Sequence, residues 1–481
     1  MERRVFFVWS RRISFVLLVV FFVSAVSIGI STKSNVDNFS RNLKSGASPD
    51  VTSQSAVAVA NKVDFLLSVT NLPLAKQIFS LLDLNFASIR NEINSVILAS
   101  PALLGAESPK RYLIAFQNSA EARGTGGILG AFAIIEFEKG KLRIIKTGSN
   151  DQFDGLSLSK IPVQVPAEFI KLYGQNPAIF QNSNLSPHFP YGARIWLGLW
   201  REEFSQSLDG VIAVDPTALS YMLNSTGPIT LPNGQRITSE NVVSQTLKVA
   251  YERYEGDTKA RKQYLVNIMD ATAERFNSGK FSKIDMARAL RDGILANRIL
   301  IYSTDSDAQS KISKVRLGGF MSVETNNEYR AVIQNIDAGK LDYYLDRSVT
   351  IQSQTCKKQR ETQVRVRVTN TLKTGVGLSS YVLTRSDKGK PANLVLGSHR
   401  FKVFIYGPTN SKLISVSREN RTANLGGSSI ERKRPIYVAD VDLAPGASEE
   451  LIANFSGGIG KITFIDQPLV RETKLAIKDR C

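Results

Sequence analysis

Cysteine and histidine are nearly absent from this chain of 481 residues, which contains two of each. So small a set cannot build a zinc cluster of Cys or His ligands. A Ser-His-Asp or Cys-His arrangement is also left with almost no candidates, since either one needs a histidine beside the nucleophile. The sequence therefore excludes a zinc cluster of Cys or His ligands and leaves few candidates for a histidine-activated nucleophile.

Long apolar runs are absent beyond the N-terminus, so the chain does not have the pattern of a polytopic membrane protein. Hydrophobic residues make up 43% of the chain and charged residues 22%, a balance that permits a large buried core. At roughly 150 residues per domain, the length allows about three domains.

Acidic residues are too few to balance the basic ones, and the net charge is +18. The imbalance is concentrated in residues 355–481, which carry 22 Lys and Arg against 11 Asp and Glu. The densest cluster is Arg432-Lys433-Arg434. A basic surface in this region predicts salt-sensitive association with an anionic polymer or with lipid headgroups. A basic face that is merely solvated is the alternative.

The one long apolar run covers residues 13–32, which contain no charged residue. Twenty helical residues at about 1.5 Å each span about 30 Å, the thickness of a bilayer core. Four arginines and one glutamate precede the run, and this positive flank predicts a cytoplasmic N-terminus (1–12) with the bulk of the chain extracytoplasmic. A cleaved signal peptide and a buried core helix are the alternatives.

Three regions follow this predicted transmembrane helix. Residues 33–109 combine a polar stretch, which predicts a solvated stalk, with apolar residues at helical spacing, which predict a pair of helices separated at Pro73. Residues 110–345 alternate strand and helix patterns and predict a layered α/β domain. In residues 355–481 the helical period disappears, and short alternating segments predict a basic antiparallel β-sandwich.

Within the α/β region, several boundaries have explicit signals. A buried strand is predicted over 112–116, and a hairpin over 131–137 and 142–145 turns at Lys139-Gly140. Asp215 and Pro216 supply the cap and first position of a helix that Gly227 ends. Further helices are predicted over 193–204, 239–254, 258–276 and 284–294.

A glycine-rich segment follows the first buried strand, namely Arg123, Gly124, Thr125, Gly126 and Gly127. Glycines let backbone N–H groups converge on an anion, and an arginine beside them adds a forked pair of donors. The segment is not a dinucleotide-binding fingerprint, because the next element has a strand pattern. It predicts either a polar ligand site or a tight connection between two strands.

Arg253 and Arg261 form a second candidate. They belong to adjoining helices joined by a loop around Gly256, so both could point to the end of one cleft. Cationic side chains in such a cleft suit a diphosphate or a phosphosugar. An ordinary solvated helix surface is the alternative.

Two further features concern a metal ion and a disulfide. Asp151 and Asp154 could supply oxygen ligands to Mg²⁺, although a segment of this composition can also be a simple turn. Cys356 stands just before the first predicted sandwich strand, and Cys481 follows the last one. If those strands are neighbours, a disulfide between the two cysteines would close the sandwich; two free thiols are the alternative.

A series of separated segments is distinctive because of its order along the chain: Tyr112–Gln117 with Asn118–Gly127, then Asn184–Pro190, Asp209–Pro216, Thr226–Pro228, Thr238–Val242 and Lys340–Tyr344. Together they resemble the bacterial envelope-protein family known as domain of unknown function 4012. The resemblance runs from about residue 110 to the C-terminus. It implies a membrane-anchored protein and no established activity.

A more distant resemblance is carried by Tyr251-x-Arg253 followed by Asp257, Arg261 and Gln263. The pattern is similar to helices of the LytR-CpsA-Psr family, which transfers polyprenyl-diphosphate-linked glycopolymers to the cell wall with arginines and a divalent cation. This chain departs from that family at two places: Arg123-Gly124-Thr125 stands where the family has Arg-x-Asp, and no arginine precedes Asp151.

Taken together, the sequence predicts a single-pass, extracytoplasmic envelope protein with an α/β layered domain of LytR-CpsA-Psr-like architecture followed by an antiparallel β-sandwich. The leading hypothesis is binding, and beyond that transfer, of an anionic or polyprenyl-diphosphate-linked cell-wall glycopolymer. The sequence establishes no cofactor, and Mg²⁺ is the one candidate. The alternative is a non-catalytic structural or adaptor protein of the envelope. The expected compartment argues against nucleic acid as a partner despite the basic charge.

Overall fold

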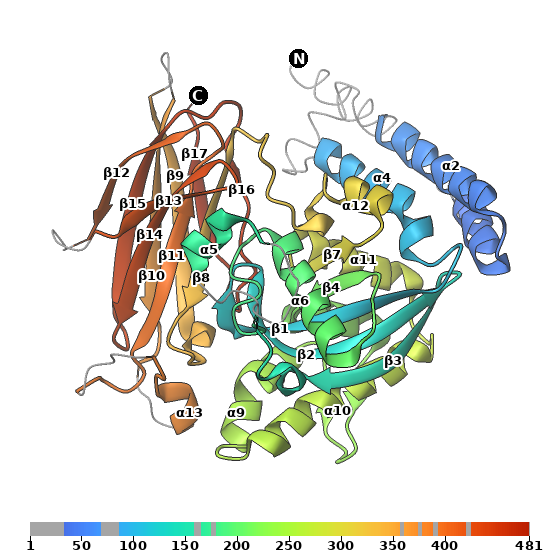
Figure 1. Ribbon diagram of the computed structural model, residues 1–481, viewed down its shortest axis with the longest axis horizontal. Coiled ribbons are helices and arrows are strands. Elements are labelled where there is room, and N and C mark those ends of the chain that lie inside the picture. Colours follow the sequence, from blue (N-terminus) through green and yellow to red (C-terminus); the bar gives the residue numbers. More distant parts are fainter. Residues whose placement is uncertain are drawn as a thin grey trace, which may run out of the picture. The chain divides into compact units, whose positions relative to one another are not determined.

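The computed structural model describes residues 33–68, 86–157, 165–174, 179–355, 360–373, 378–387, 393–419 and 425–480 (Figure 1). The chain divides into two compact units. The first consists of Met1–Lys110, Glu136–Arg143 and Ser303–Val315, and the second of Arg111–Ile135, Ile144–Tyr302 and Arg316–Cys481.

The first unit is mainly helical. Residues 33–45 are helical, and α2 (Pro49–Ser68) and α12 (Ser306–Ile312) both pack against α4 (Phe86–Leu103). The pair of helices that apolar spacing predicted is present, but the stretch predicted as a solvated stalk is helical as well. Thr52, Ala56 and Val59 lie buried at helical spacing, and the Thr52 hydroxyl donates to the Ala47 carbonyl at 3.3 Å. Small and polar side chains thus form a buried helix face here. Their composition alone had suggested a solvated segment.

The predicted transmembrane helix over residues 13–32 and the predicted break at Pro73 lie outside the described residues. Among the helices that the structure does describe, none combines the length and the apolar character needed to cross a bilayer.

A five-stranded sheet in the order β3-β2-β1-β4-β7 is the centre of the α/β region. Its strands are β1 (Lys110–Arg123), β2 (Gly126–Glu138), β3 (Lys141–Ser149), β4 (Gly210–Val214) and β7 (Ile299–Ser303). β1 and β4 run parallel, with Leu113 opposite Val211, while the β1–β2 connection is a hairpin. The sheet is therefore mixed.

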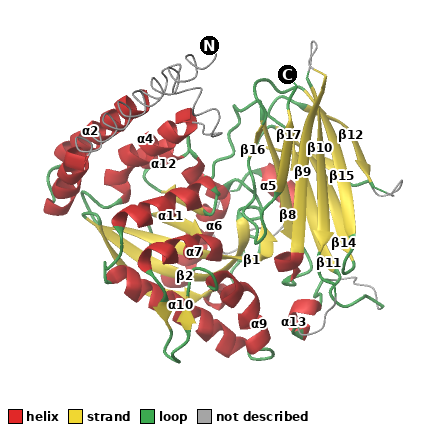
Figure 2. Cartoon of the chain, turned by 180° about the vertical axis from the view of Figure 1, so that it is seen from behind, coloured by secondary structure: helices red, strands yellow, loops and turns green. Residues whose placement is uncertain are grey.

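Helices cover both faces of this sheet (Figure 2). Along β1, Leu113 and Ala115 pack in one apolar cluster with α6 (Phe189–Phe204), whereas Ile114 and Phe116 pack near Met269 of α10 (Thr258–Asn277). Successive side chains of a strand point to opposite faces, so this alternation places α6 and α10 on opposite sides. The prediction of a layered α/β domain is confirmed.

The local boundary signals are also confirmed. Lys139 and Gly140 adopt φ angles of 50° and 74° at the β2–β3 turn, the left-handed pair that a two-residue hairpin requires. The Asp215 carboxylate accepts the Ala218 N–H at 2.7 Å and caps α7 (Pro216–Thr226). Gly227, with φ of 78°, ends that helix.

The remaining helical elements are short apart from α11, which packs on α7. They are η2 (Asn150–Phe153), α5 (Ala167–Tyr173), α8 (Val242–Ser244), η3 (Gln245–Val249), α9 (Ala250–Arg253), α11 (Lys283–Leu295), η4 (Arg316–Gly318), η5 (Leu341–Tyr344) and α13 (Ser380–Leu383). The two-stranded β5 (Ile229–Thr230) and β6 (Arg236–Ile237) complete this region.

Two five-stranded sheets form the C-terminal sandwich, in the orders β12-β15-β10-β9-β17 and β13-β14-β11-β8-β16. Neighbours pair antiparallel, except that β16 is parallel to β8 and β17 is parallel to β9. The strands are β8 (Glu328–Asn335), β9 (Leu345–Thr355), β10 (Glu361–Asn370), β11 (His399–Tyr406), β12 (Lys412–Arg418), β13 (Gly427–Glu431), β14 (Arg434–Leu443), β15 (Ser448–Ser456), β16 (Thr463–Phe464) and β17 (Lys474–Lys478).

The sandwich begins earlier than residue 355, since β8 and β9 belong to its two sheets. Every residue of β8 is buried. Tyr329, Ala331 and Ile333 enter the sandwich core, whereas Arg330 and Gln334 alternate with them and are buried on the other face. A strand covered on both faces, with polar residues among the buried ones, lacks the clean alternation that predicts a strand.

The cluster Arg432-Lys433-Arg434 is not an exposed basic patch. Arg432 and Lys433 form the turn between β13 and β14, with φ angles of 49° and 61°. The Arg434 side chain is fully buried and donates to the carbonyls of Glu328 at 2.9 Å and Ser322 at 3.0 Å. Burial lowers the pKa of Arg434 to about 10. The densest basic cluster of the sequence thus provides buried hydrogen bonds through Arg434 as well as surface charge.

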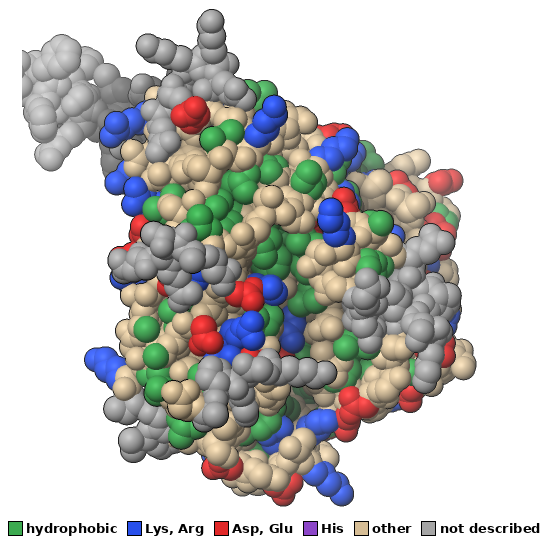
Figure 3. All heavy atoms as spheres, turned by 60° about the vertical axis from the view of Figure 1, so that its left-hand side comes forward, with side chains coloured by type: hydrophobic (Ala, Val, Ile, Leu, Met, Phe, Trp, Pro, Cys, Tyr) green, Lys and Arg blue, Asp and Glu red, His purple; other side chains and the backbone are tan. Residues whose placement is uncertain are grey.

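Other cationic side chains of the sandwich have carboxylate partners. Arg365 pairs with Glu450 at 3.3 Å, and Arg367 pairs with Glu419 at 3.2 Å. Figure 3, turned toward the side where Figure 1 shows the sandwich, shows basic side chains interspersed with acidic and apolar ones. The excess charge of this region is therefore distributed and partly neutralised on the face in view.

The two cysteines lie outside the described residues, but the strands next to them are neighbours. β9 ends at Thr355, and β17 pairs with β9 in parallel, with Lys478 opposite Gln352. The strand that follows Cys356 is β10, and it is not a neighbour of β17, because β9 lies between them. The strand that pairs with β17 is β9, which precedes Cys356.

We expect non-reducing peptide mass spectrometry of envelope-purified protein to find Cys356 linked to Cys481, because paired strands lead toward both. Recovery of both cysteines as free thiols, alkylated without prior reduction, would contradict the disulfide. A Cys481→Ser variant is the control that should leave Cys356 alkylated.

Candidate functional site

The glycine-rich segment is the tight turn between β1 and β2. A Cβ atom on Gly124 would lie 2.2 Å from the Leu185 carbonyl oxygen, and one on Gly127 would lie 2.2 Å from the backbone of Asn118. Both distances are far below contact distance, so only glycine fits at these positions. The glycines thus serve close backbone packing, the alternative that the sequence left open.

Thr125 and Gly126 belong to the same turn. The Thr125 hydroxyl donates to the Gln117 side-chain oxygen at 2.7 Å and accepts from Asn184 at 2.8 Å. Gly126 has a φ of 135°, which favours glycine. The polar groups of the turn are therefore engaged with the protein itself.

Arg123 is also directed into the protein. Its side chain is buried, and the guanidinium donates to Glu121 at 2.8 Å and to the carbonyls of Gln181, Ala122 and Asn335 at 2.8 to 3.2 Å. A guanidinium has five N–H donors, and at least four are used here. The structure gives Arg123 an internal role, and its role as a ligand contact remains an untested prediction.

Glu121 links Arg123 to a second buried cation. Its other carboxylate oxygen accepts from the Lys340 ammonium. Burial raises the pKa of Glu121, but the charges of Lys340 and Arg123 lower it more, so the net shift is downward. Burial likewise lowers the pKa of Lys340, and the Glu121 charge raises it above its ordinary value. Glu121 and Lys340 therefore hold each other in the ionised state.

His399 forms a buried bridge between two carboxylates in the same part of the molecule. Its Nδ1 lies 2.9 Å from Asp337, and its Nε2 lies 3.0 Å from Asp342. Burial lowers the pKa of His399, but the two aspartates raise it to about 10. Asp342 also accepts the backbone N–H of Ala122 at 3.0 Å, which ties the bridge to β1. His399 is therefore a charged structural residue.

Arg261 differs from these cations because no carboxylate of the described residues pairs with it. It lies in the first turn of α10, is 7% exposed, and donates only a long 3.4 Å hydrogen bond to Thr258. Its guanidinium carbon lies 4.8 Å from the ring centroid of Tyr251 and 4.5 Å from that of Tyr381. The two rings stack on each other at 5.7 Å. Tyr381 is 41% exposed, so the guanidinium lies just below the surface.

Tyr251 connects Arg261 to the buried network. Asn118 donates a hydrogen bond to its hydroxyl, and the Lys340 ammonium lies 5.8 Å from its ring centroid. In this region the carboxylates of Glu121, Asp337 and Asp342 pair with Arg123, Lys340 and His399. No carboxylate of the described residues forms an ion pair with Arg261.

The helix predicted over 239–254 is interrupted in a way that the sequence does not signal. Residues Gln245–Val249 form a π-helical turn between α8 and α9. Such turns are frequent at functional sites because the extra residue shifts the following side chains around the helix axis. Here it precedes Tyr251 and Arg253 directly, and residue spacing alone does not place their side chains.

Arg253 is not part of this cluster. It is exposed, donates to the Gln235 side chain at 2.6 Å, and lies 5.5 Å from the ring centroid of Tyr264. The structure therefore brings Arg123 and Arg261 to one network through Glu121, Lys340 and Tyr251, and places Arg253 with other partners.

The predicted metal ligands also have other surroundings. Asp151 pairs with Lys262 at 3.2 Å, and Asp154 is exposed. Burial raises the pKa of Asp151, but the Ser149 hydroxyl and the Lys262 charge lower it more, so the net shift is downward. Within the described part of the chain, no cluster of three or more His, Cys, Asp or Glu residues could hold a metal ion. Asp151 and Asp154 thus do not form a multidentate site by themselves.

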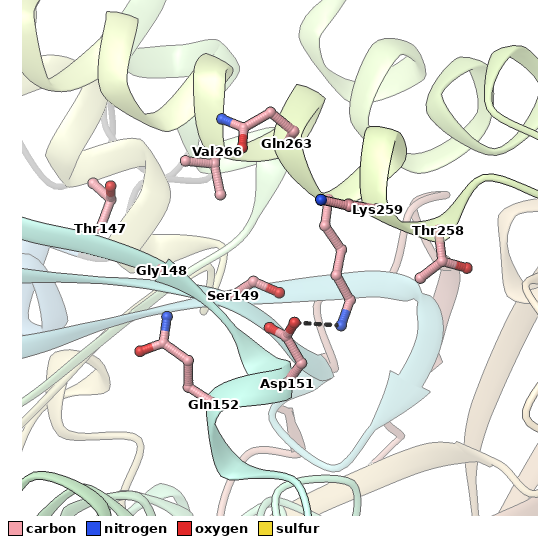
Figure 4. Close-up of a pocket in the computed structure, with 10 residues that line it drawn as sticks. Thr147, Gly148, Ser149, Asp151, Gln152, Thr258, Lys259, Gln263 and Val266 are labelled. Atoms are coloured by element: carbon pink, nitrogen blue, oxygen red, sulfur yellow. Dashed lines mark ion pairs between the residues drawn. The ribbon is translucent and has the colours of Figure 1, made fainter.

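Asp151 lines a cleft of about 560 Å³. One wall is the end of β3 with η2, and the other is the first turns of α10 (Figure 4). The dashed line in Figure 4 marks the ion pair of Asp151. The lining residues are Thr147, Gly148, Ser149, Asp151, Gln152, Thr258, Lys259, Lys262, Gln263 and Val266.

The fold described above consists of a mixed α/β domain followed by a β-rich region of mainly antiparallel sheets. Residues 107–251 match the family described as protein of unknown function (DUF4012). The resemblance drawn from the motifs is confirmed over that segment. The comparison with curated proteins gave no match.

Three solved structures show a remote likeness. Protein gbs0355 from Streptococcus agalactiae is 11% identical, with 46% of this chain and 76% of that chain covered and a TM-score of 0.29. Lin1025 from Listeria innocua is 11% identical, with 48% and 85% covered and a TM-score of 0.24. The transcriptional regulator yvhJ from Bacillus subtilis is 12% identical, with 44% and 78% covered and a TM-score of 0.22. Values this low support no argument about function.

The His399 bridge predicts a specific dependence of stability on pH. In the folded chain His399 keeps its proton up to about pH 10, whereas its ordinary pKa is 6.5. Its stabilising contribution is therefore complete below about pH 6.5 and is lost as the pH rises to about 10. We expect His399→Gln to lower the free energy of unfolding at pH 7 by about 3–5 kcal/mol, because two buried carboxylates lose their cation.

Urea unfolding of both proteins between pH 6 and 10 checks this, and the difference in stability should shrink as the pH rises. A difference that is constant over that range would contradict a charged bridge. His188→Asn is the control, since burial holds the pKa of His188 well below 6.5 and its contribution should change only on the acid side.

Proposed function

We propose that this protein is a membrane-anchored, extracytoplasmic envelope protein that binds an anionic group of a cell-wall glycopolymer or of its lipid-linked precursor. The α/β region with a LytR-CpsA-Psr-like architecture carries the site, and residues 13–32 supply the anchor. The observation that carries the proposal is Arg261, a guanidinium that is nine-tenths buried, lies close to the surface and has no carboxylate partner among the described residues.

A buried charge without a counter-ion is costly, and a protein normally pairs it. Tyr251 and Tyr381 offset part of this cost, because a guanidinium over an aromatic ring gains cation–π energy. A phosphate or diphosphate would offset the rest through forked, charge-assisted hydrogen bonds, which are stronger away from bulk water. An anion from solution is thus the partner that this arrangement lacks.

Binding is favoured over transfer. Transfer in the manner that the distant resemblance implies needs a divalent cation and further arginines at the phosphates. Here Arg123 is engaged with Glu121 and carbonyl groups, and Asp151 is paired with Lys262. The same internal pairing favours the non-catalytic alternative, which is a structural or adaptor protein of the envelope. That alternative differs from the proposal because it needs no anion at Arg261.

Calorimetric titration of the full chain in detergent tests the site, with pyrophosphate and a short-chain polyprenyl diphosphate as ligands, with and without Mg²⁺. A charged hydrogen-bonded contact contributes about 1.5–3 kcal/mol, so Arg261→Ala should weaken binding roughly ten- to a hundredfold. Arg261→Lys should restore it only in part, because an ammonium lacks the planar fork.

Arg253→Ala is the matched control for this titration. It removes an exposed arginine one helix away, and the affinity should stay within about twofold of the unmodified chain. Absence of binding with every ligand, in both metal conditions, would overturn the anion-binding proposal. Binding that survives Arg261→Ala would place the site elsewhere.

The anchor and its orientation have a separate test. Protease added to intact spheroplasts should digest the chain beyond residue 33 and leave only the N-terminal region protected, because the positive flank holds residues 1–12 in the cytoplasm. Protection of the bulk of the chain would contradict the proposed orientation. Release into the medium of a chain shortened at its N-terminus would indicate that the predicted anchor is a cleaved signal peptide.

A further inference from the structure

β17 is an edge strand of the sandwich with one side of its backbone open. It is the last strand of its sheet, and among the described strands it pairs only with β9 (Figure 1). All five of its residues are exposed. Pairing with β9 uses one side of the backbone, and no other backbone hydrogen bond of the described residues reaches this strand. Its outer edge therefore presents N–H and C=O groups with which a further strand can pair.

The backbone of β17 is regular along its whole length. Natural edge strands commonly avoid pairing through a bulge or a proline. β12, the other edge of the same sheet, has a register shift between Leu413 and Ser415. β17 keeps an unbroken register against β9 from Lys474 to Lys478 and contains no proline. Another strand can therefore pair with it without a local distortion.

One face of β17 carries apolar side chains that remain half exposed. Leu475 and Ile477 lie opposite Val349 and Ile351 in the β17–β9 register, and these two residues of β9 belong to the sandwich core. Leu475 and Ile477 therefore extend the core-facing layer of the sheet. The opposite sheet ends in β16, a strand of only two residues, and the two side chains stay 46% and 40% exposed. A strand added beside β17 would bury apolar surface here.

The other face of β17 is basic. Lys474 and Lys478 stand at its two ends, with Ala476 between them on the same face. The Lys474 side chain is 80% exposed and lies 3.9 Å from Asp346, a loose ion pair. Lys478 is exposed, and no ion pair within the described ranges includes it. An added strand thus meets a cation near each end, and acidic residues opposite these cations would be attracted.

Two other occupants of this edge fit the charge pattern poorly. A second copy of β17, paired antiparallel about Ala476, would place Lys474 opposite Lys478 at both ends, and like charges directly opposite each other are destabilising. Outside the described residues the printed chain has only two acidic residues, Glu2 and Asp83. Those segments therefore cannot supply an acidic residue at each end of a short strand.

We infer that β17 is a docking edge for an extended acidic segment of another protein, which adds a strand to the sandwich. In this mode main-chain hydrogen bonds supply affinity and alternate side chains supply specificity. The bound segment places apolar residues beside Leu475 and Ile477 and acidic residues beside Lys474 and Lys478. This surface is separate from the proposed anion site and goes beyond the proposed function.

A labelled synthetic peptide of sequence Asp-Val-Thr-Val-Asp, flanked by glycines and capped at both ends, tests this edge by fluorescence anisotropy with the full chain in detergent. The sequence reads the same in both directions, so the result does not depend on strand direction. We expect saturable binding that weakens as salt is added. A peptide with Lys in place of both Asp residues should bind about tenfold more weakly, since two attractive contacts become repulsive. N-methylation of the three central residues should abolish binding, because it removes the main-chain donors.

Variants of the chain test the same contacts from the other side. Lys474→Glu and Lys478→Glu together should reverse the preference, so that the Lys peptide binds more tightly than the Asp peptide. Leu475→Ser should weaken both peptides roughly fivefold, because less apolar surface is buried. Lys412→Glu is the matched control, since Lys412 is an exposed lysine on β12, the other edge of the sheet. It should leave both affinities within about twofold.

No binding of the Asp peptide, equal affinity for the Asp and Lys peptides, or binding that survives N-methylation would each overturn the acidic docking edge. Dimerisation of the chain without peptide, abolished by Leu475→Ser, would show instead that a second copy occupies β17. None of these results bears on Arg261, so the inference and the proposed function fail or stand separately.

Discussion

The buried ion network around Glu121 is the interaction on which the arrangement of the second unit depends. Glu121 holds Arg123 and Lys340 at the hairpin end of β1. Residues 335–342, which precede β9, return to the same point through Asp342, which accepts the Ala122 N–H. Removing one partner of a buried ion pair strongly destabilises the fold, because the other charge is then left buried without a counter-ion. The network thus couples the turn of the α/β sheet to the loop between β8 and β9 of the sandwich.

The same network explains why the cationic residues of the sequence fall into different roles. Arg123, Lys340 and His399 are satisfied by carboxylates or carbonyls, so their charges stabilise the fold. Arg261 stands at the edge of the network with tyrosine rings and one long hydrogen bond. An internal counter-ion distinguishes Arg123 from Arg261, the arginine that we propose binds an anion, and net charge alone does not reveal this difference.

Much of the fold follows from local signals. Helix ends and tight turns could be predicted because each depends on one or two residues and their backbone conformations. Examples are the helix ends at Asp215 and Gly227 and the turn at Lys139-Gly140. The sequence did not predict β8 or the π-helical turn before Tyr251, because both depend on tertiary packing. β8 is covered on two faces with polar residues inside, and the extra residue of the turn leaves no trace in periodicity.

The candidate site was predictable only in part. Arg261 could be singled out from its helix and charge, but Tyr381 is 120 residues away in sequence, and nothing in the sequence joins it to Tyr251. Glycine spacing singled out Gly124–Gly127 but could not distinguish an anion-binding loop from close backbone packing. That distinction depends on Leu185 and Asn118, which only the folded chain brings near.

A crystal structure of the full chain with pyrophosphate at saturating concentration is the most direct measurement of the central claim, that Arg261, which pairs with no carboxylate of the described residues, binds an anion. We expect the diphosphate within hydrogen-bonding distance of the Arg261 guanidinium, beside Tyr381 and Thr258, with Arg123 still bound to Glu121. Diphosphate bound at Arg253 or elsewhere, with Arg261 unoccupied, would contradict the account.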